Sequence, residues 1–253
     1  LTEKGIDWRL KSVPPLQTFF KWGVLMPVAS LDARSWKRES SNLLTDMGFE
    51  PVIESDLVAI RNAWRGVTYR TEGHIEFLRS FAKAGDSSED VFKRSLHNFL
   101  RSFIALYMLT LITIVRVSKR VSVPSDWGKQ FLYWERCLTT SPGQFIDGIT
   151  PGSRDFLLFG IIQCHCSIPV PPLSALREDG RLTLIRAWIC SMQERYPEYQ
   201  HCYSAQYFDT GLSPRTSSSN FQQLLFGVGV VVMLAALPIV FPTMIFYILR
   251  TPR

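Results

Sequence analysis

The sequence predicts three parts in chain order: a small α/β unit, an all-helical domain and one C-terminal membrane-spanning helix. Over residues 1–50, prolines interrupt short apolar runs, a pattern typical of short strands. From residue 54 onward, apolar residues recur at helical spacing almost throughout. Residues 224–249 contain no charged side chain, and about 20 apolar residues are enough to span a bilayer.

The N-terminal unit, residues 1–50, is expected to hold the strands. Its predicted elements are the end of a helix at 1–5, strands at 8–13, 24–28 and 33–36, and a helix at 39–47. Gly48 and Pro51 end the last helix, because neither residue favours helical continuation.

Residues 51–208 are expected to form the helical domain. Helices are predicted at 54–84, 91–117, 126–138, 154–167 and 182–194. The stretch from 103 to 115 is nearly all apolar, but it is too short to cross a bilayer and predicts a buried core helix. Residues 169–172 read PVPP. Their three prolines predict an extended connector.

A polar linker over 209–223 is expected to lead into a transmembrane helix over 224–249. Pro238 and Pro242 lie about one helical turn apart, which predicts a kink that neighbouring helices must accommodate. Arg250 and Arg253 would act as interfacial anchors.

Small residues within this apolar run predict close packing against other transmembrane subunits. They are Gly227, Gly229, Ala235 and Ala236. The expected partners are therefore the lipid bilayer and further membrane subunits.

The charge balance argues against nucleic acid as a partner. The chain has 28 Lys and Arg against 22 Asp and Glu, which gives a formal net charge of +6. The basic residues form no long run and accompany no nucleic-acid-binding motif. A mild attraction to anionic lipid headgroups fits this excess better.

The cysteines predict a reducing compartment. The chain has 5 of them, an odd number in a chain large enough to build an apolar core, which argues against a disulfide framework. We expect a single-pass protein of a bacterial inner membrane or a mitochondrial or other organellar membrane, with its folded domain on the cytoplasmic or matrix-like side. The chain begins at Leu1 without Met, so we expect either a processed N-terminus or further residues upstream.

A metal site is not expected. Cys164, His165 and Cys166 are adjacent, and adjacent residues of a helix point in different directions, whereas structural zinc sites use CxxC-type pairs. Buried cysteines in a core helix are the simpler interpretation. The sequence also lacks GxSxG, P-loop, HExxH and GxGxxG motifs.

The order of the parts resembles the glutathione transferase family over about residues 1–208. The segments that carry this resemblance are LTEKGIDWRLKSV, GVLMPV, WKRESSNLL, GQFIDGITPGSRDFLLFG and RLTLIRAWICSMQERYP. The resemblance implies a thioredoxin-like unit over residues 1–50, truncated at its start, and the family's all-helical C-terminal domain over 51–208. It also implies glutathione as the ligand.

The resemblance assigns roles to individual residues. Pro27 would follow a cis peptide bond, with the backbone amide of Met26 pairing with the cysteinyl part of glutathione; the alternative is that Pro27 only ends a strand. Glu39 and Ser40 would open a helix that holds the γ-glutamyl carboxylate, or Ser40 is a plain helix cap. Asp155 would be a structural helix cap in either case. The catalytic residue would lie upstream of Leu1, so none is assigned.

Two functions follow as expectations. The first is a membrane-anchored accessory or interaction subunit of a larger membrane protein complex, with weak or no transferase activity. The alternative is an active membrane-bound glutathione transferase that conjugates glutathione to a hydrophobic electrophile. A weaker third interpretation is a membrane-tethered redox or chaperone-like module, which needs a CxxC motif upstream of Leu1.

Overall fold

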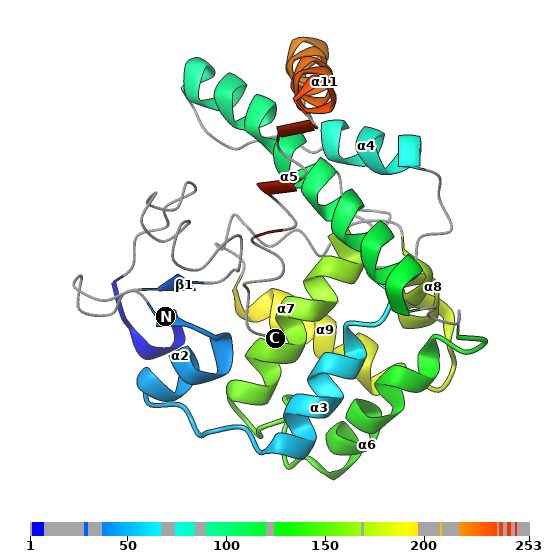
Figure 1. Cartoon of the computed structure of the whole chain (residues 1–253). Coiled ribbons are helices and arrows are strands. Elements are labelled where there is room, and N and C mark those ends of the chain that lie inside the picture. The colour runs from blue at the N-terminus through cyan, green and yellow to red at the C-terminus, as the bar shows by residue number, and fades with distance from the viewer. Residues whose placement is uncertain are drawn as a thin grey trace.

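The computed structural model describes residues 2–7, 28–29, 37–66, 74–83, 90–119, 124–167, 170–196, 208, 218–236, 238–239, 242–243 and 246. The described helices form two groups with separate hydrophobic clusters. We call the first group the lobe and the second the arm. Figure 1 shows the arm helices α4, α5 and α11 together on one side of the molecule, with the lobe helices below them in this view.

The lobe is built from short helices around one apolar core. Its elements are α2 (Ser40–Asp46), α3 (Glu54–Ala63), η2 (Gly128–Phe131), α6 (Leu132–Thr140), α7 (Ser153–Ser167), α8 (Pro171–Glu178) and α9 (Thr183–Arg195). Helix α7 packs against α2 and α3, while α9 packs against α6 and α8. The residues that alternate at helical spacing in the sequence therefore face a common interior.

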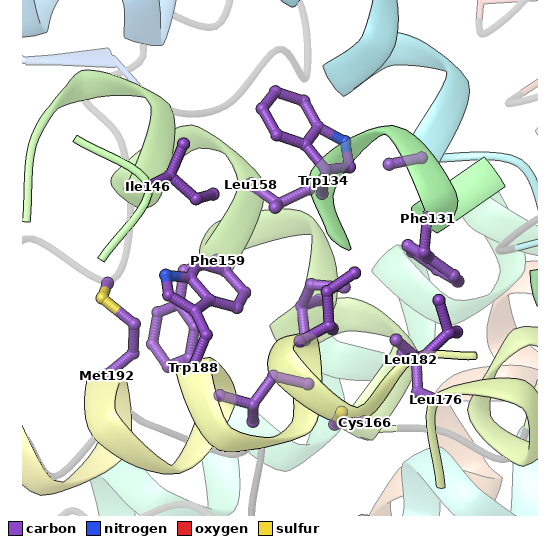
Figure 2. Close-up of a cluster of buried hydrophobic side chains, with 14 of the residues drawn as sticks. Phe131, Trp134, Ile146, Leu158, Phe159, Cys166, Leu176, Leu182, Trp188 and Met192 are labelled. Carbon is purple, nitrogen blue, oxygen red and sulfur yellow. The ribbon is translucent and has the colours of Figure 1, made fainter. Parts of the chain in front are cut away.

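Large side chains fill the lobe core (Figure 2). Trp134, Leu158 and Ile162 are fully buried, and so is Ile189. The rings of Phe159 and Trp188 meet edge to face with their centroids 5.9 Å apart, a favourable arrangement for aromatic pairs. This packing joins α6, α7 and α9 into one body.

Gly66 is required where α3 leaves the lobe core. Its φ of +104° lies in the region that favours glycine, and an added Cβ would lie 2.1 Å from Cγ of Pro172. Gly66 therefore lets the chain turn directly against the first turn of α8.

The arm consists of α4 (His74–Lys83), α5 (Val91–Lys119) and α11 (Asn220–Ala235). Helix α11 packs mainly on α5 and also touches α4, although more than a hundred residues separate it from them in the sequence. Phe77, Ala105 and Phe226 form the buried centre of this group. The sequence predicted one helix over 54–84, whereas the structure shows α3 and α4 as separate helices in different groups.

The expected α/β thioredoxin-like unit is wrong. The described part of residues 1–50 holds the short helix η1 (Thr2–Lys4), helix α2 and two strands, β1 (Val28–Ala29) and β2 (Lys37–Arg38). These strands pair antiparallel over two residues each, which is too short to form the helix-covered sheet of an α/β layer. The described residues are otherwise predominantly helical, so the transferase-like fold class is not supported.

The expected C-terminal spanning helix is also wrong. Helix α11 has 16 residues and ends at Ala235, so it is about 24 Å long against a hydrocarbon core of about 30 Å. Pro238 follows soon after the helix end, where proline disfavours continuation. The helix also begins at Asn220, inside the expected linker, and buries one face on α5.

Across the described residues, no single helix has both the length and the apolar composition to cross a membrane. Helices α7 and α8 meet these criteria only as a pair bent by 110°. Both contribute buried side chains to the lobe core.

Candidate interaction surface

The start of α11 is fixed to the end of α4. The backbone N–H of Ser218 donates to the carbonyl of Lys83 at 3.2 Å, and its hydroxyl donates to the carbonyl of Ala82. Ser219 and Gln222 then form a reciprocal capping box, with the Ser219 hydroxyl accepting from the Gln222 amide. These bonds satisfy groups at both helix ends that otherwise lack partners. The sequence SSSN is therefore a helix start within an expected linker.

One face of α11 packs closely on α5. Gln222, Phe226, Gly229 and Met233 are its buried residues. A Cβ added at Gly229 would lie 2.3 Å from Oγ of Ser102 and 2.8 Å from the carbonyl oxygen of Phe99. Only glycine allows this approach of the two helices. The close packing expected of Gly229 is thus satisfied within the chain.

The opposite face of α11 is exposed and apolar. Its exposed residues from Phe221 to Ala235 are all apolar or glycine: Phe221, Leu224, Gly227, Val228, Val231, Val232, Leu234 and Ala235. Phe221, Leu224 and Val231 expose 59%, 63% and 66% of their surface. We call this set the outer row. Its spacing of three and four places it along one side of the helix.

The arm also exposes apolar side chains near the start of α5. Val91 and Phe92 are 68% and 77% exposed, and Ile75 of α4 is similarly accessible. Exposed apolar residues that occur singly or in small groups are common on protein surfaces, so the outer row is the larger apolar feature of the arm.

The arm carries the positive charge of the protein. Helices α4, α5 and α11 contain one acidic residue, Glu76, and seven basic ones: Arg79, Lys83, Lys93, Arg94, Arg101, Arg116 and Lys119. The formal charge of these helices is therefore +6, and Asp90, which accepts from the backbone N–H groups of Phe92 and Lys93, lies at the start of α5 beside them.

Two of these cations lie close to the start of the outer row. The Arg101 guanidinium donates to the carbonyl of Phe81 at 2.9 Å, so it lies at the last turn of α4. Lys83 bonds through its carbonyl to Ser218, within one helical turn of Phe221. We call this meeting point of α4, α5 and α11 the cationic junction. The positive end of the α11 helix dipole lies there too.

The distribution of charge along the sequence indicates this surface, although the overall composition does not. Residues 91–119 include five Lys or Arg and no Asp or Glu. Spread over the whole chain, the excess of basic residues is modest. The excess of basic residues is large in α4 and α5, which pack together with α11.

The residues that the sequence proposed for glutathione do not form a described site. Met26 and Pro27 lie outside the described residues. Ser40 begins α2, and Glu39 precedes it with a φ of 80° and no side-chain capping bond. The glutathione-binding role of these four residues stays a prediction.

Asp155 lies buried in the first turn of α7. Its carboxylate accepts hydrogen bonds from the backbone N–H groups of Ile146, Asp147 and Gly152 at 2.7 to 3.0 Å, and from Nε1 of Trp188 at 2.7 Å. Burial raises the pKa of Asp155, and these donors oppose the rise. It therefore fastens the loop before α7, including the N–H of Gly152 that directly precedes the helix, and α9 behind it.

The adjacent Cys164, His165 and Cys166 lie in α7 as parts of the lobe. His165 is fully buried, and its Nε2–H donates to the carbonyl of Ala63 at 2.7 Å. Burial lowers the pKa of His165 to about 4 and raises the pKa of Cys164 to about 11. These groups are neutral at physiological pH. Within the described ranges, no group of His, Cys, Asp and Glu side chains is arranged to hold a metal ion.

A polar network that sequence reasoning missed links α3, α6 and α7. The Tyr133 hydroxyl donates to Asp56, which is buried, and Arg154 reaches the other oxygen of Asp56 at 3.4 Å. Arg154 also pairs with Asp147. The hydrogen bond to Asp56 raises the pKa of Tyr133, followed by the effect of burial. Each charge has an opposite partner, so this network stabilises the lobe.

No protein-family model, curated protein or solved structure matches this chain. The function must therefore be argued from the geometry above.

Proposed function

We propose that this protein is a membrane-associated interaction protein, an accessory component whose arm holds the lobe at a membrane surface. The observation that carries the proposal is the outer row of α11. This helix is apolar on both faces, yet only one of them is covered by α4 and α5.

The energetics favour a second contact for this helix. The outer row exposes large aliphatic or aromatic side chains, including Phe221, Leu224 and Val231. Removing a half-exposed side chain of this size from water yields about 1 kcal/mol. Several such side chains together provide enough free energy for reversible binding to the boundary between headgroups and acyl chains.

The lobe has the character of a displayed domain. Most of its large apolar side chains are gathered in one core, and its buried polar residues Asp56 and Asp155 have hydrogen-bond partners. In the proposed accessory role, the lobe would contact other subunits of a larger membrane assembly.

The test is flotation of the full chain with phospholipid vesicles. The double variant Leu224→Asp, Val231→Asp should lose binding, because two charges would have to enter the apolar boundary. Its matched control is Ile53→Asp, Ile149→Asp, which changes two lobe residues of comparable exposure, 64% and 78%. The control should float like the wild type. Equal binding by both variants, or no binding by the wild type, would contradict the proposal.

A further inference from the structure

We infer that the arm recognises anionic lipid headgroups and lies in the plane of the bilayer, an inference that rests on the proposed membrane-associated function. The outer row faces the acyl boundary, and the cationic junction faces phosphate groups. Phosphatidylserine and similar anionic phospholipids have this chemistry.

The first step in the argument is the location of the charge. An excess of +6 over the whole chain is small, but the three arm helices contain all of it. A basic residue close to an anionic membrane surface contributes appreciably to binding, whereas distant charges are screened within a Debye length. The cations that can act together on a single surface are therefore those that lie close together, and Lys83 and Arg101 meet this condition at the cationic junction.

The second step is the position of the charge beside the apolar residues. Arg101 is held at the end of α4 by its bond to the Phe81 carbonyl, and Ser218 ties the start of α11 to Lys83. Phe221 and Leu224 of the outer row follow within two turns. Cations and apolar side chains thus border one another, as required at the level of lipid headgroups.

The third step concerns orientation. Helix α11 is too short to cross the hydrocarbon core and is fixed by one face to α5. Its other face is apolar along its full length from Phe221 to Ala235. A helix of this kind places the outer row in the boundary when its axis lies parallel to the membrane plane.

The experiment compares two vesicle compositions with the full chain. One is phosphatidylcholine alone, and the other is a three-to-one mixture of phosphatidylcholine and phosphatidylserine. The wild type should bind the mixture much more tightly, and this preference should fall as salt is added. The variant Lys83→Gln, Lys93→Gln should lose roughly tenfold to thirtyfold in partitioning onto the mixture. Lys83 and Lys93 are both exposed residues of the arm.

The matched control is Lys129→Gln, Arg177→Gln. It removes the same charge from exposed positions of the lobe and should bind like the wild type. Equal binding of the wild type to both vesicles, with no effect of the arm variant, would overturn the headgroup inference and leave the proposed function standing. Binding to neither vesicle would overturn both.

Other occupants of the outer row give different results. A photoreactive residue at Val231 should cross-link to lipid in the phosphatidylserine vesicles. If it instead cross-links to a second copy of the chain, and Val231→Asp converts a dimer to a monomer, the face belongs to a self-contact. That result would overturn the inference.

Discussion

In the lobe, most large apolar side chains turn into one core, and exposed ones such as Ile53 and Ile149 lie on different segments, whereas in the arm α11 presents apolar side chains both to α5 and to the exterior. The lobe also has balanced charge, while the arm carries the excess of positive charge. The difference shows that the lobe completes its own core. The arm has more apolar surface than its three helices can cover.

The largest effect that separates the two regions is expected from Asp155→Ala. This change leaves backbone donors of Ile146, Asp147 and Gly152 without their buried acceptor, as well as Nε1 of Trp188. We expect a loss of about 4 kcal/mol or more in the free energy of unfolding of the lobe, because each unsatisfied buried donor costs about 1–3 kcal/mol. Denaturant unfolding followed by tryptophan fluorescence measures it.

Glu54→Gln is the control for Asp155→Ala, because Glu54 is an exposed acidic residue of the lobe. It should change the free energy of unfolding by well under 1 kcal/mol. A small effect of Asp155→Ala would show that the lobe core does not depend on this cluster.

The next effect is pH dependence of the lobe through His165. Burial lowers the pKa of His165 in the folded state to about 4, from an ordinary value of about 6.5. The unfolded chain therefore binds the proton more readily, so stability is complete above about pH 6.5 and is lost as the pH falls toward 4. The difference corresponds to about 3 kcal/mol.

His165→Gln removes this titration while keeping an amide that can donate to Ala63. The pH dependence attributable to His165 is the difference between the stability curves of the wild type and the variant from pH 7 to 4. Parallel curves would mean that His165 keeps an ordinary pKa in the folded protein.

The third expected effect destabilises the arm and leaves the lobe unchanged. Gly229→Leu places a side chain where even a Cβ would meet Ser102 and Phe99 of α5. We expect α11 to separate partly from α5, with a loss of about 1–3 kcal/mol in the stability of the arm. Hydrogen exchange of α11 amides, compared with amides of α9, measures it.

Gly227→Leu is the matched control, because a Cβ at Gly227 meets nothing within 4 Å. It should leave α11 in place and stabilise the helix slightly, since glycine disfavours helices. Faster exchange in both variants alike would contradict the assignment of inner and outer faces.

The smallest effect is expected from Ser219→Ala, which removes the side-chain cap of α11. The first turn of the helix should lose about 1 kcal/mol. Hydrogen exchange should increase at the first amides of α11 and remain unchanged at Met233. Ser174→Ala, at an exposed position in α8, should have no effect on α11.

Much of the helical content was predictable, and the reason differs between helices. Helix α5 was expected over residues 91–117 and is found at Val91–Lys119, because long periodic segments determine their own structure. The α/β unit was wrongly inferred from short runs interrupted by prolines. Short apolar runs specify a strand only if partner strands pair with them, and the described residues form a ladder of two residues per strand.

The sequence predicted which residues of the candidate surface are apolar, but it did not predict which helices they pack against. The apolar row with Gly227 and Gly229 was recognised as a contact segment, and a spanning helix was inferred because the run has no charge. Gly229 instead packs on Ser102 of the same chain. The pairing of α11 with α4 and α5 joins segments far apart in the chain, and local periodicity carries no information about such contacts.

The sequence by itself determined that the C-terminal region is apolar, that most of the chain is helical and that the basic excess is small. It could not determine which face of α11 is covered, because a helix that is apolar all round has no periodicity to distinguish its faces. Tertiary packing made that choice: α5 accepts the face that contains Gly229, where glycine allows close approach, and leaves Phe221, Leu224 and Val231 exposed. The same packing brought Lys83 and Arg101 to the start of α11, close to Phe221.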